Sequence, residues 1–343
     1  MNHVMEDRKI ILGLVGVSVV SWNVIRKLQE ILTNYRKSEL SEWIPVGRIK
    51  SLHIYPIKSC KGKNVFQYEC TPLGAVSGEY FDRFFLVING ETGKFHTART
   101  KPQMVLIESN IQDGIVTLSY PDLPSVQFNI QDVLKEKNLK PGFLHGQLRT
   151  DGYDCGDIAS EFFSKIIDEP NTRLIMYHPD LFTERTCKTE DSWWNNKVPK
   201  RVDDTAYADL APFLITTQAS LDELNRNLEH DVTSTHFRPN MVIDDCAPWD
   251  EDKWQDLRIG QVELQCFKPC TRCILTTVDP TLGTKDKNMQ PLRKLREIRL
   301  APEGKMRDEF KDSPIFGTNA GIVREGHIHV GQTVWARYKK SAF

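Results

Sequence analysis

The chain has 343 residues, of which 40% are hydrophobic and 27% are charged, and its formal net charge is −1. This balance is ordinary for a globular protein long enough for two cores, and it gives no sign of a nucleic-acid partner. The eight cysteines are scattered along the chain, which favours a reducing compartment over a disulfide-stapled secreted protein.

The only long apolar run of the chain extends from Ile10 to Ile25, between two pairs of basic residues. The run is short for a membrane span, which needs about 20 residues, but Trp22 suits an interface and the basic side chains can snorkel. No small-residue cleavage site follows it, which argues against a secretory signal. We therefore predict a membrane anchor and stalk over residues 1–44. The alternatives are a buried core helix for the run and a disordered linker for residues 23–43.

Alternating apolar and polar residues predict a strand that begins at Val46 and ends in a turn at Pro56. Lys58 and Ser59 follow directly. A lysine, a hydroxyl and free backbone groups at a strand end suit a phosphate. A solvated loop is the alternative, because lysine is mostly exposed in proteins.

A second buried strand is predicted over residues 82–88, with a charged pair at its entry. Arg83 is costly to bury at this position unless an anion lies near it. Asp82 can supply that negative charge, so a structural ion pair and a ligand contact both remain open. Arg99 is a further candidate of the same kind.

A helix is predicted from Asp157, which resembles an N-cap, to Ile167. The polar stretch 183–208 is the best position for a domain boundary or a mobile loop. We therefore predict one domain over residues 45–180 and a second over residues 181–343.

Phe213–Thr217 is predicted to be a strand, and Ser220 and Glu223 have the spacing of a capping box that opens a helix. Such a strand-turn-helix entry exposes backbone donors that could also bind an anion. Farther along, Arg238 offers a planar fork for a phosphate or a carbonyl, and Asn240 can both donate and accept hydrogen bonds.

Cys270 and Cys273 enclose Thr271 and Arg272, and the β-branched run Ile274–Val278 that follows predicts a buried strand. The positive charge of Arg272 favours a thiolate at Cys273, which a soft metal needs. A zinc site would lack a second cysteine pair, and a thioredoxin-like dithiol would precede a helix. Two ordinary buried cysteines are the remaining alternative.

The run Cys-Thr-Arg-Cys-Ile-Leu-Thr-Thr-Val-Asp-Pro resembles the molybdenum-ligand segment of MOSC-domain proteins, and among them it is most similar to the mitochondrial amidoxime-reducing component family. Other segments resemble the family in the same order, over roughly residues 45–340. They are Tyr55–Gly62, Asp82-Arg83, Thr97–Arg99 and Phe237–Asn240. Periodicity by itself indicates an α+β fold. The resemblance implies a mixed α/β MOSC N-terminal domain followed by a β-barrel MOSC domain.

The resemblance also implies the molybdenum cofactor, a pterin dithiolene with one phosphate, bound between the two domains. Cys273 would be the metal ligand, and Cys270 is the alternative because its position relative to the predicted strand is only slightly worse. Lys58 and Ser59 would hold the phosphate end. The other predicted cofactor-binding residues are Arg83, Thr217, Arg238, Asn240, Thr271 and Arg272.

The activity that the resemblance implies is the two-electron reduction of N-hydroxylated substrates, such as amidoximes to amidines. The sequence contains no Walker A motif and no Rossmann glycine fingerprint, so the electrons should come from a partner. The resemblance implies cytochrome b5 and NADH-cytochrome b5 reductase, at the mitochondrial outer membrane with the catalytic domain facing the cytosol.

Two other functions compete with this reading. One is a carrier of the cofactor or of sulfur without turnover, and the other is a redox dithiol protein that uses Cys270 and Cys273. The acidic residues between Asp244 and Asp252 could steer a basic partner, or they could form only a solvated loop.

Overall fold

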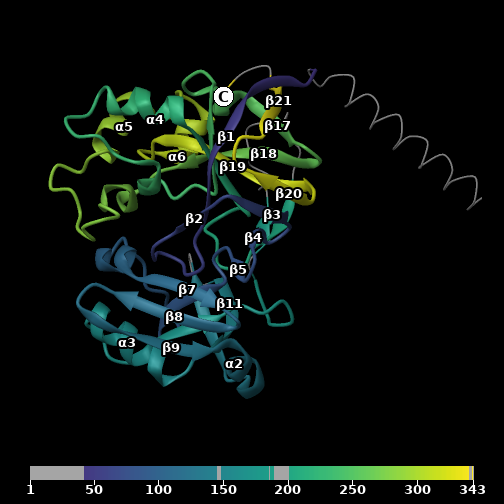
Figure 1. Ribbon diagram of the computed structural model, residues 1–343. Coiled ribbons are helices and arrows are strands. Elements are labelled where there is room, and N and C mark those ends of the chain that lie inside the picture. Colours follow the sequence, from purple (N-terminus) through teal and green to yellow (C-terminus); the bar gives the residue numbers. More distant parts are fainter. Residues whose placement is uncertain (1–41, 145–147, 185, 189–200, 340–341, 343) are drawn as a thin grey trace, which may run out of the picture.

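The computed structural model describes residues 42–144, 148–184, 186–188, 201–339 and 342 (Figure 1). The predicted anchor and stalk therefore lie outside the described residues, except for residues 42–44. Among the helices of the described part, none is long and apolar enough to cross a membrane.

Seven strands close into a barrel in the order β16-β15-β19-β18-β17-β21-β1, and β1 pairs with β16 to complete the ring. Their bounds are β1 Ile44–Ile54, β15 Phe213–Thr217, β16 Met241–Asp244, β17 Trp254–Ile259, β18 Val262–Thr271, β19 Ile315–Arg324 and β21 Thr333–Tyr338. Alternate side chains point inward and fill the interior, among them the fully buried Leu52, Trp254 and Leu257. The predicted barrel is confirmed.

The strand predicted from Val46 exists, but it joins the barrel of the C-terminal half. β1 pairs with β16 on one side and, on the other, with β21 and then with β2 (Lys63–Val65). The described chain thus begins in the barrel, leaves it for a second lobe and returns at β15. The domain boundary between residues 180 and 181 remains a proposal. Although β1 belongs to the first of the two proposed domains in the sequence, it lies with the barrel in space.

The second lobe, drawn in blue and teal in Figure 1, contains two sheets in the orders β10-β11-β12-β6 and β7-β8-β9. Its elements are β6 Phe85–Asn89, β7 Glu108–Gln112, β8 Ile115–Tyr120, β9 Leu123–Asn129, α2 Ile130–Glu136, β10 Leu139–Leu144, β11 Leu148–Asp154, α3 Asp157–Ile167 and β12 Thr172–Met176. Because these strands all pair antiparallel, the lobe is α+β and not the mixed α/β domain we predicted. The predicted helix α3 is present, but Gly156 is its N-cap, and the Asp157 carboxylate accepts instead from Arg173 at 2.7 Å.

A third sheet, in the order β20-β3-β4-β5, lies between the barrel and the second lobe (Figure 1). It joins β3 Gln67–Thr71, β4 Gly74–Ser77 and β5 Tyr80–Phe81 to β20 Gly326–His329. The remaining elements are η1 Pro102–Leu106, β13 Thr186–Lys188, β14 Val202–Asp204, α4 Gln218–Asn225, η2 Ser234–His236, η3 Asp250–Lys253, η4 Ile274–Thr277, α5 Leu292–Ile298 and α6 Lys305–Phe310. Helices α4, α5 and α6 cover one side of the barrel.

Candidate functional site

The residues after β18 do not form the strand that we predicted. Ile274–Thr277 is a single 3-10 turn, η4, and Cys273 precedes it in an extended conformation. The backbone N–H and the hydroxyl of Thr276 both donate to the Cys273 carbonyl oxygen, at 3.0 Å each. Threonine hydroxyls can bond to backbone carbonyls three residues back, and this local alternative outcompetes the β preference of the run. The half-buried Cys273 thiol therefore stands at a turn whose backbone is hydrogen-bonded.

Cys273 lines a cavity of about 440 Å³ that collects loops from both halves of the chain. Eight of the nine predicted cofactor-binding residues line it: Lys58, Ser59, Arg83, Arg238, Asn240, Thr271, Arg272 and Cys273. Cys270 lines it too, and both cysteines are free thiols. Asp209 and His236 were missed by the sequence analysis, because neither belongs to a recognisable motif: Asp209 stands in a loop and His236 ends the short helix η2.

Positive charge dominates the cavity lining. Among the described residues that line the cavity, Asp209 is the single carboxylate, against six cations, which leaves an excess of five positive charges. The cations are Lys58, Arg83, Arg99, Arg238, Lys268 and Arg272. A cavity of this composition favours a ligand with several negative charges.

Lys58 and Ser59 are buried, each only 5% exposed, so the solvated-loop alternative is wrong. The Lys58 ammonium donates to the Tyr207 carbonyl at 2.6 Å and to Asp209 Oδ1 at 2.7 Å. Ser59 has a positive φ of 68°, which turns the chain sharply after β1. Lys58 is thus held at the cavity wall by the loop that carries Tyr207 and Asp209.

Arg83 and Arg238 both lie over the ring of Tyr55, with Cζ 4.4 and 4.2 Å from its centroid. Arg83 forms the ion pair with Asp82 that we considered, with 2.5 Å between Nη1 and Oδ2. Nη2 of Arg238 is buried and has no hydrogen-bond partner among the described residues. Burial, and then the charge of Arg83, lower the pKa of Arg238. Arg238 therefore carries an unused donor at the cavity wall.

The Arg272 guanidinium connects three segments of the site. Nε and Nη2 donate to the Phe316 carbonyl at 2.8 and 2.5 Å, and Nη1 donates to the Phe237 carbonyl at 3.0 Å. The two phenylalanine rings are stacked with centroids 4.0 Å apart. Arg272 thus brings a positive charge next to Cys273, while its side-chain donors bind backbone groups of the protein.

Asn240 and Thr217 differ in how they relate to the cavity. The Asn240 amide bridges β15 and β1, because Oδ1 accepts from the Leu214 N–H at 3.1 Å and Nδ2 donates to the His53 carbonyl at 3.5 Å. Thr217 does not line the cavity. It is the N-cap of α4, which begins at Gln218, so the capping box predicted at Ser220 is wrong.

Residues 46–170 match the family described as the MOSC N-terminal beta barrel domain, and residues 202–335 match the MOSC domain. The chain belongs to the MOSC domain family. It is similar to mitochondrial amidoxime-reducing component 1 of Homo sapiens, with 38% identity over 84% of this chain and 83% of that protein. The Mus musculus component 1 is 36% identical over 94% of this chain and 89% of its own length. The Danio rerio component 1 is 33% identical over 96% and 95%.

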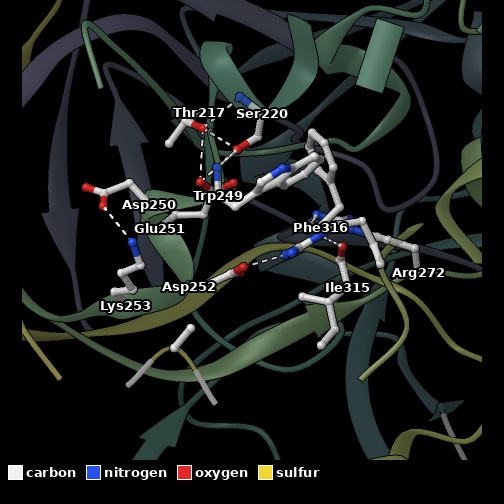
Figure 2. A network of polar contacts seen from close by, with 12 residues as sticks. Thr217, Ser220, Trp249, Asp250, Glu251, Asp252, Lys253, Arg272, Ile315 and Phe316 are labelled. Atoms are coloured by element: carbon white, nitrogen blue, oxygen red, sulfur yellow. Dashed lines mark hydrogen bonds and ion pairs between the residues drawn. The ribbon is translucent and has the colours of Figure 1, made fainter. Parts of the chain in front are cut away.

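In this MOSC protein two of the acidic residues that could steer a basic partner, Glu251 and Asp252, are buried, whereas Asp245 is exposed. Glu251 and Asp252 are only 0% and 3% exposed. Figure 2 shows Glu251 directed at Thr217 and Ser220. Asp252 pairs with Arg299 at 2.5 Å. The flanking Trp249 and Trp254 were the sequence signal for burial, because two tryptophans beside a charged turn suggest packing.

Gly317, in β19 of this MOSC protein, provides a test of how closely the Arg272 region is packed. A Cβ at this position, where φ is 83°, would lie 2.6 Å from the Ile215 carbonyl and 3.4 Å from Arg272 Nη2. We expect Gly317→Ala to cost about 2 kcal/mol of unfolding free energy. Gly331→Ala is the control, because φ is 88° there but no atom lies within 4 Å, and it should cost about 1 kcal/mol. Urea unfolding of the full chain measures both, and equal costs would contradict the close approach.

Proposed function

We propose that this protein is a molybdenum-cofactor-dependent reductase of N-hydroxylated compounds, with Cys273 as the protein ligand of the metal. The observation that carries the proposal is the cavity in which a free Cys273 thiol stands among an excess of five positive charges. Relatives that cover most of the chain are named amidoxime-reducing components, and this name supports amidoximes as the substrate class.

The residues present fit the cofactor. A pterin dithiolene with one phosphate brings several negative charges, which the cationic lining would neutralise. Arg238 Nη2 and Arg99 Nε are buried without partners among the described residues. Leaving such donors unbonded costs about 1–3 kcal/mol each, and an anionic ligand would remove that cost.

Each part of the cavity would have a distinct role. Lys58 and Ser59 would hold the phosphate end, and Arg238 would donate to the pterin or its phosphate. In the part of the chain that the structure describes, no three His, Cys, Asp or Glu side chains form a metal cluster. The cysteines that line the cavity are therefore the candidate ligands, and we assign the role to Cys273. The bound cofactor would supply the two-electron redox chemistry.

The electron donors we propose are cytochrome b5 and NADH-cytochrome b5 reductase, at the mitochondrial outer membrane with the catalytic domain facing the cytosol. The names of the relatives, mitochondrial amidoxime-reducing components, support the mitochondrial assignment. Since Glu251 and Asp252 are buried, they cannot dock a basic partner. The positive charge at the cavity would instead favour an electron donor with an acidic face.

The test is metal analysis of the full chain produced in a host that synthesises the cofactor, together with turnover of an aromatic amidoxime by cytochrome b5 and its reductase. About one molybdenum per chain, with turnover, would support the proposal. Molybdenum without turnover would indicate the carrier function. No molybdenum together with a Cys270–Cys273 disulfide would contradict both and indicate a redox dithiol protein.

Lys58→Met should weaken the hold on the cofactor, because it removes a buried ammonium from the proposed phosphate site. We expect molybdenum to be lost about tenfold faster than from the unmodified protein, measured as molybdenum retained after timed gel filtration. Lys61→Met is the matched control, since Lys61 is half exposed, pairs with Glu108 at 3.1 Å and does not line this cavity. Equal loss in both variants would contradict the role of Lys58.

A further inference from the structure

Glu251 is a fully buried carboxylate that points toward Thr217 and Ser220 (Figure 2). Its Oε2 accepts hydrogen bonds from the hydroxyls of Thr217 at 3.0 Å and Ser220 at 2.8 Å. Its Oε1 is buried without a partner among the described residues. Burying a carboxylate is costly, and a helix N-cap does not need one nearby. The position of Glu251 therefore calls for a reason beyond the capping of α4.

The contacts of Glu251 continue through Ser220 to Trp249. Ser220 Oγ, which donates to Glu251, also accepts from the backbone N–H of Trp249 at 2.8 Å. Trp249 has a φ of 63°, a left-handed conformation that needs support from its surroundings. Its ring meets Phe316 edge-on with centroids 5.9 Å apart, and the Arg299 Cζ lies 4.2 Å from its centroid.

From Trp249 and Arg299 the contacts reach residues 315–316, which bind the Arg272 side chain. Arg299 fixes Ile315 from both sides, since the Ile315 N–H donates to the Arg299 carbonyl at 2.8 Å and Arg299 Nε donates to the Ile315 carbonyl at 3.3 Å. The next residue, Phe316, offers the carbonyl that binds Nε and Nη2 of Arg272. Arg272 directly precedes Cys273, so a continuous series of contacts joins Glu251 to the turn that carries the thiol.

We propose that Glu251 is a positioning residue for the cofactor cavity: through Ser220 and Trp249 it fixes residues 315–316, and thereby the Arg272 guanidinium beside Cys273. This inference deepens the proposed function, and it rests on the proposal that the cavity binds the molybdenum cofactor. An apolar residue at this position could not accept from both hydroxyls, and Ser220 would then no longer be held in the orientation that binds the Trp249 backbone.

The test is hydrogen exchange of the full chain, followed in the peptides that contain Arg272 and Ile315. Both N–H groups are hydrogen-bonded, to the Pro314 carbonyl at 2.7 Å and to the Arg299 carbonyl at 2.8 Å. In Glu251→Ala these peptides should exchange at least about threefold faster, beyond any change in the rest of the barrel. Glu251→Gln keeps an acceptor oxygen, so it should restore the slow exchange.

Asp250→Asn is the matched control, because Asp250 belongs to the same turn but bonds elsewhere. Its Oδ2 accepts from Trp254 Nε1 at 3.0 Å and from the Tyr338 hydroxyl at 2.5 Å. Faster exchange at Arg272 and Ile315 in Glu251→Ala but not in Asp250→Asn would support the proposal. The same change in both variants, or no change in either, would overturn it.

Ser220→Ala is the second variant, for the case in which Glu251→Ala does not fold. It removes only the hydroxyl that joins Glu251 to Trp249, and it should accelerate exchange in the same two peptides. Unchanged exchange there would overturn the proposal. Hydrogen exchange can be measured without molybdenum in the protein. Unchanged exchange would therefore overturn the positioning role but not the reductase function, and a protein without molybdenum would still allow the positioning role to be tested.

Discussion

Replacing Cys273 with serine is expected to remove molybdenum from the protein and to lower amidoxime turnover at least about 100-fold, because a hydroxyl is a poor ligand for a soft metal site. Cys273 stands at the turn between β18 and η4, with its carbonyl held by Thr276. The substitution changes one atom in a half-buried side chain, so the fold should persist. Molybdenum content and turnover, measured on the same preparation, test the expectation.

Cys270→Ser is the control for this prediction, since Cys270 lines the same cavity. Burial raises the pKa of the Cys270 thiol, an effect that the charge of Arg272 opposes. We expect this variant to keep its molybdenum and to turn over within about twofold of the unmodified protein, because the proposed ligand set is intact. If Cys270→Ser lost molybdenum while Cys273→Ser kept it, Cys270 would be the ligand.

The pattern of apolar and polar residues correctly predicted several strands and helices whose apolar side is buried. Strand β15 and helix α3 lie where the apolar spacing put them, and β1 begins close to the predicted Val46. The pattern could not show that β1 closes the C-terminal barrel, because strand pairing between distant segments is not recorded in local periodicity. The pattern therefore gave no sign that β1, at the start of the proposed first domain, pairs with the barrel strands β16 and β21.

Local competition explains the errors at the site. The run after Cys273 has strong β preference, yet its threonine hydroxyls bond backward and form η4. Thr217 and Ser220 are both good N-caps, and the structure uses the former. Asp209 carries no motif and reaches Lys58 only through the fold. The charged residues singled out in the sequence thus line one cavity, while their hydrogen-bond partners were set by tertiary contacts.

Glu251→Gln is expected to change how stability depends on pH. Burial, and then the charge of Asp252, raise the pKa of Glu251 from 4.5 to about 7. The folded state therefore holds the proton more tightly than the unfolded chain. In the unmodified protein the resulting penalty is absent below pH 4.5, grows as pH rises, and is complete above about pH 7. Its size is roughly 3 kcal/mol, at about 1.4 kcal/mol per pH unit.

Glutamine carries no charge, and its amide oxygen can accept from Thr217 and Ser220 as the carboxylate does. Its NH₂ group would occupy the place of Oε1, which has no partner among the described residues, at a cost of about 1 kcal/mol that does not vary with pH. Glu251→Gln should therefore be slightly less stable than the unmodified protein near pH 5 and about 2 kcal/mol more stable near pH 8. Urea unfolding at both pH values measures the two differences, with the pH 5 pair as the internal control. A difference that stays constant between pH 5 and pH 8 would show that folding does not raise the pKa of Glu251. The buried charge would then have to be stabilised by contacts other than Thr217 and Ser220.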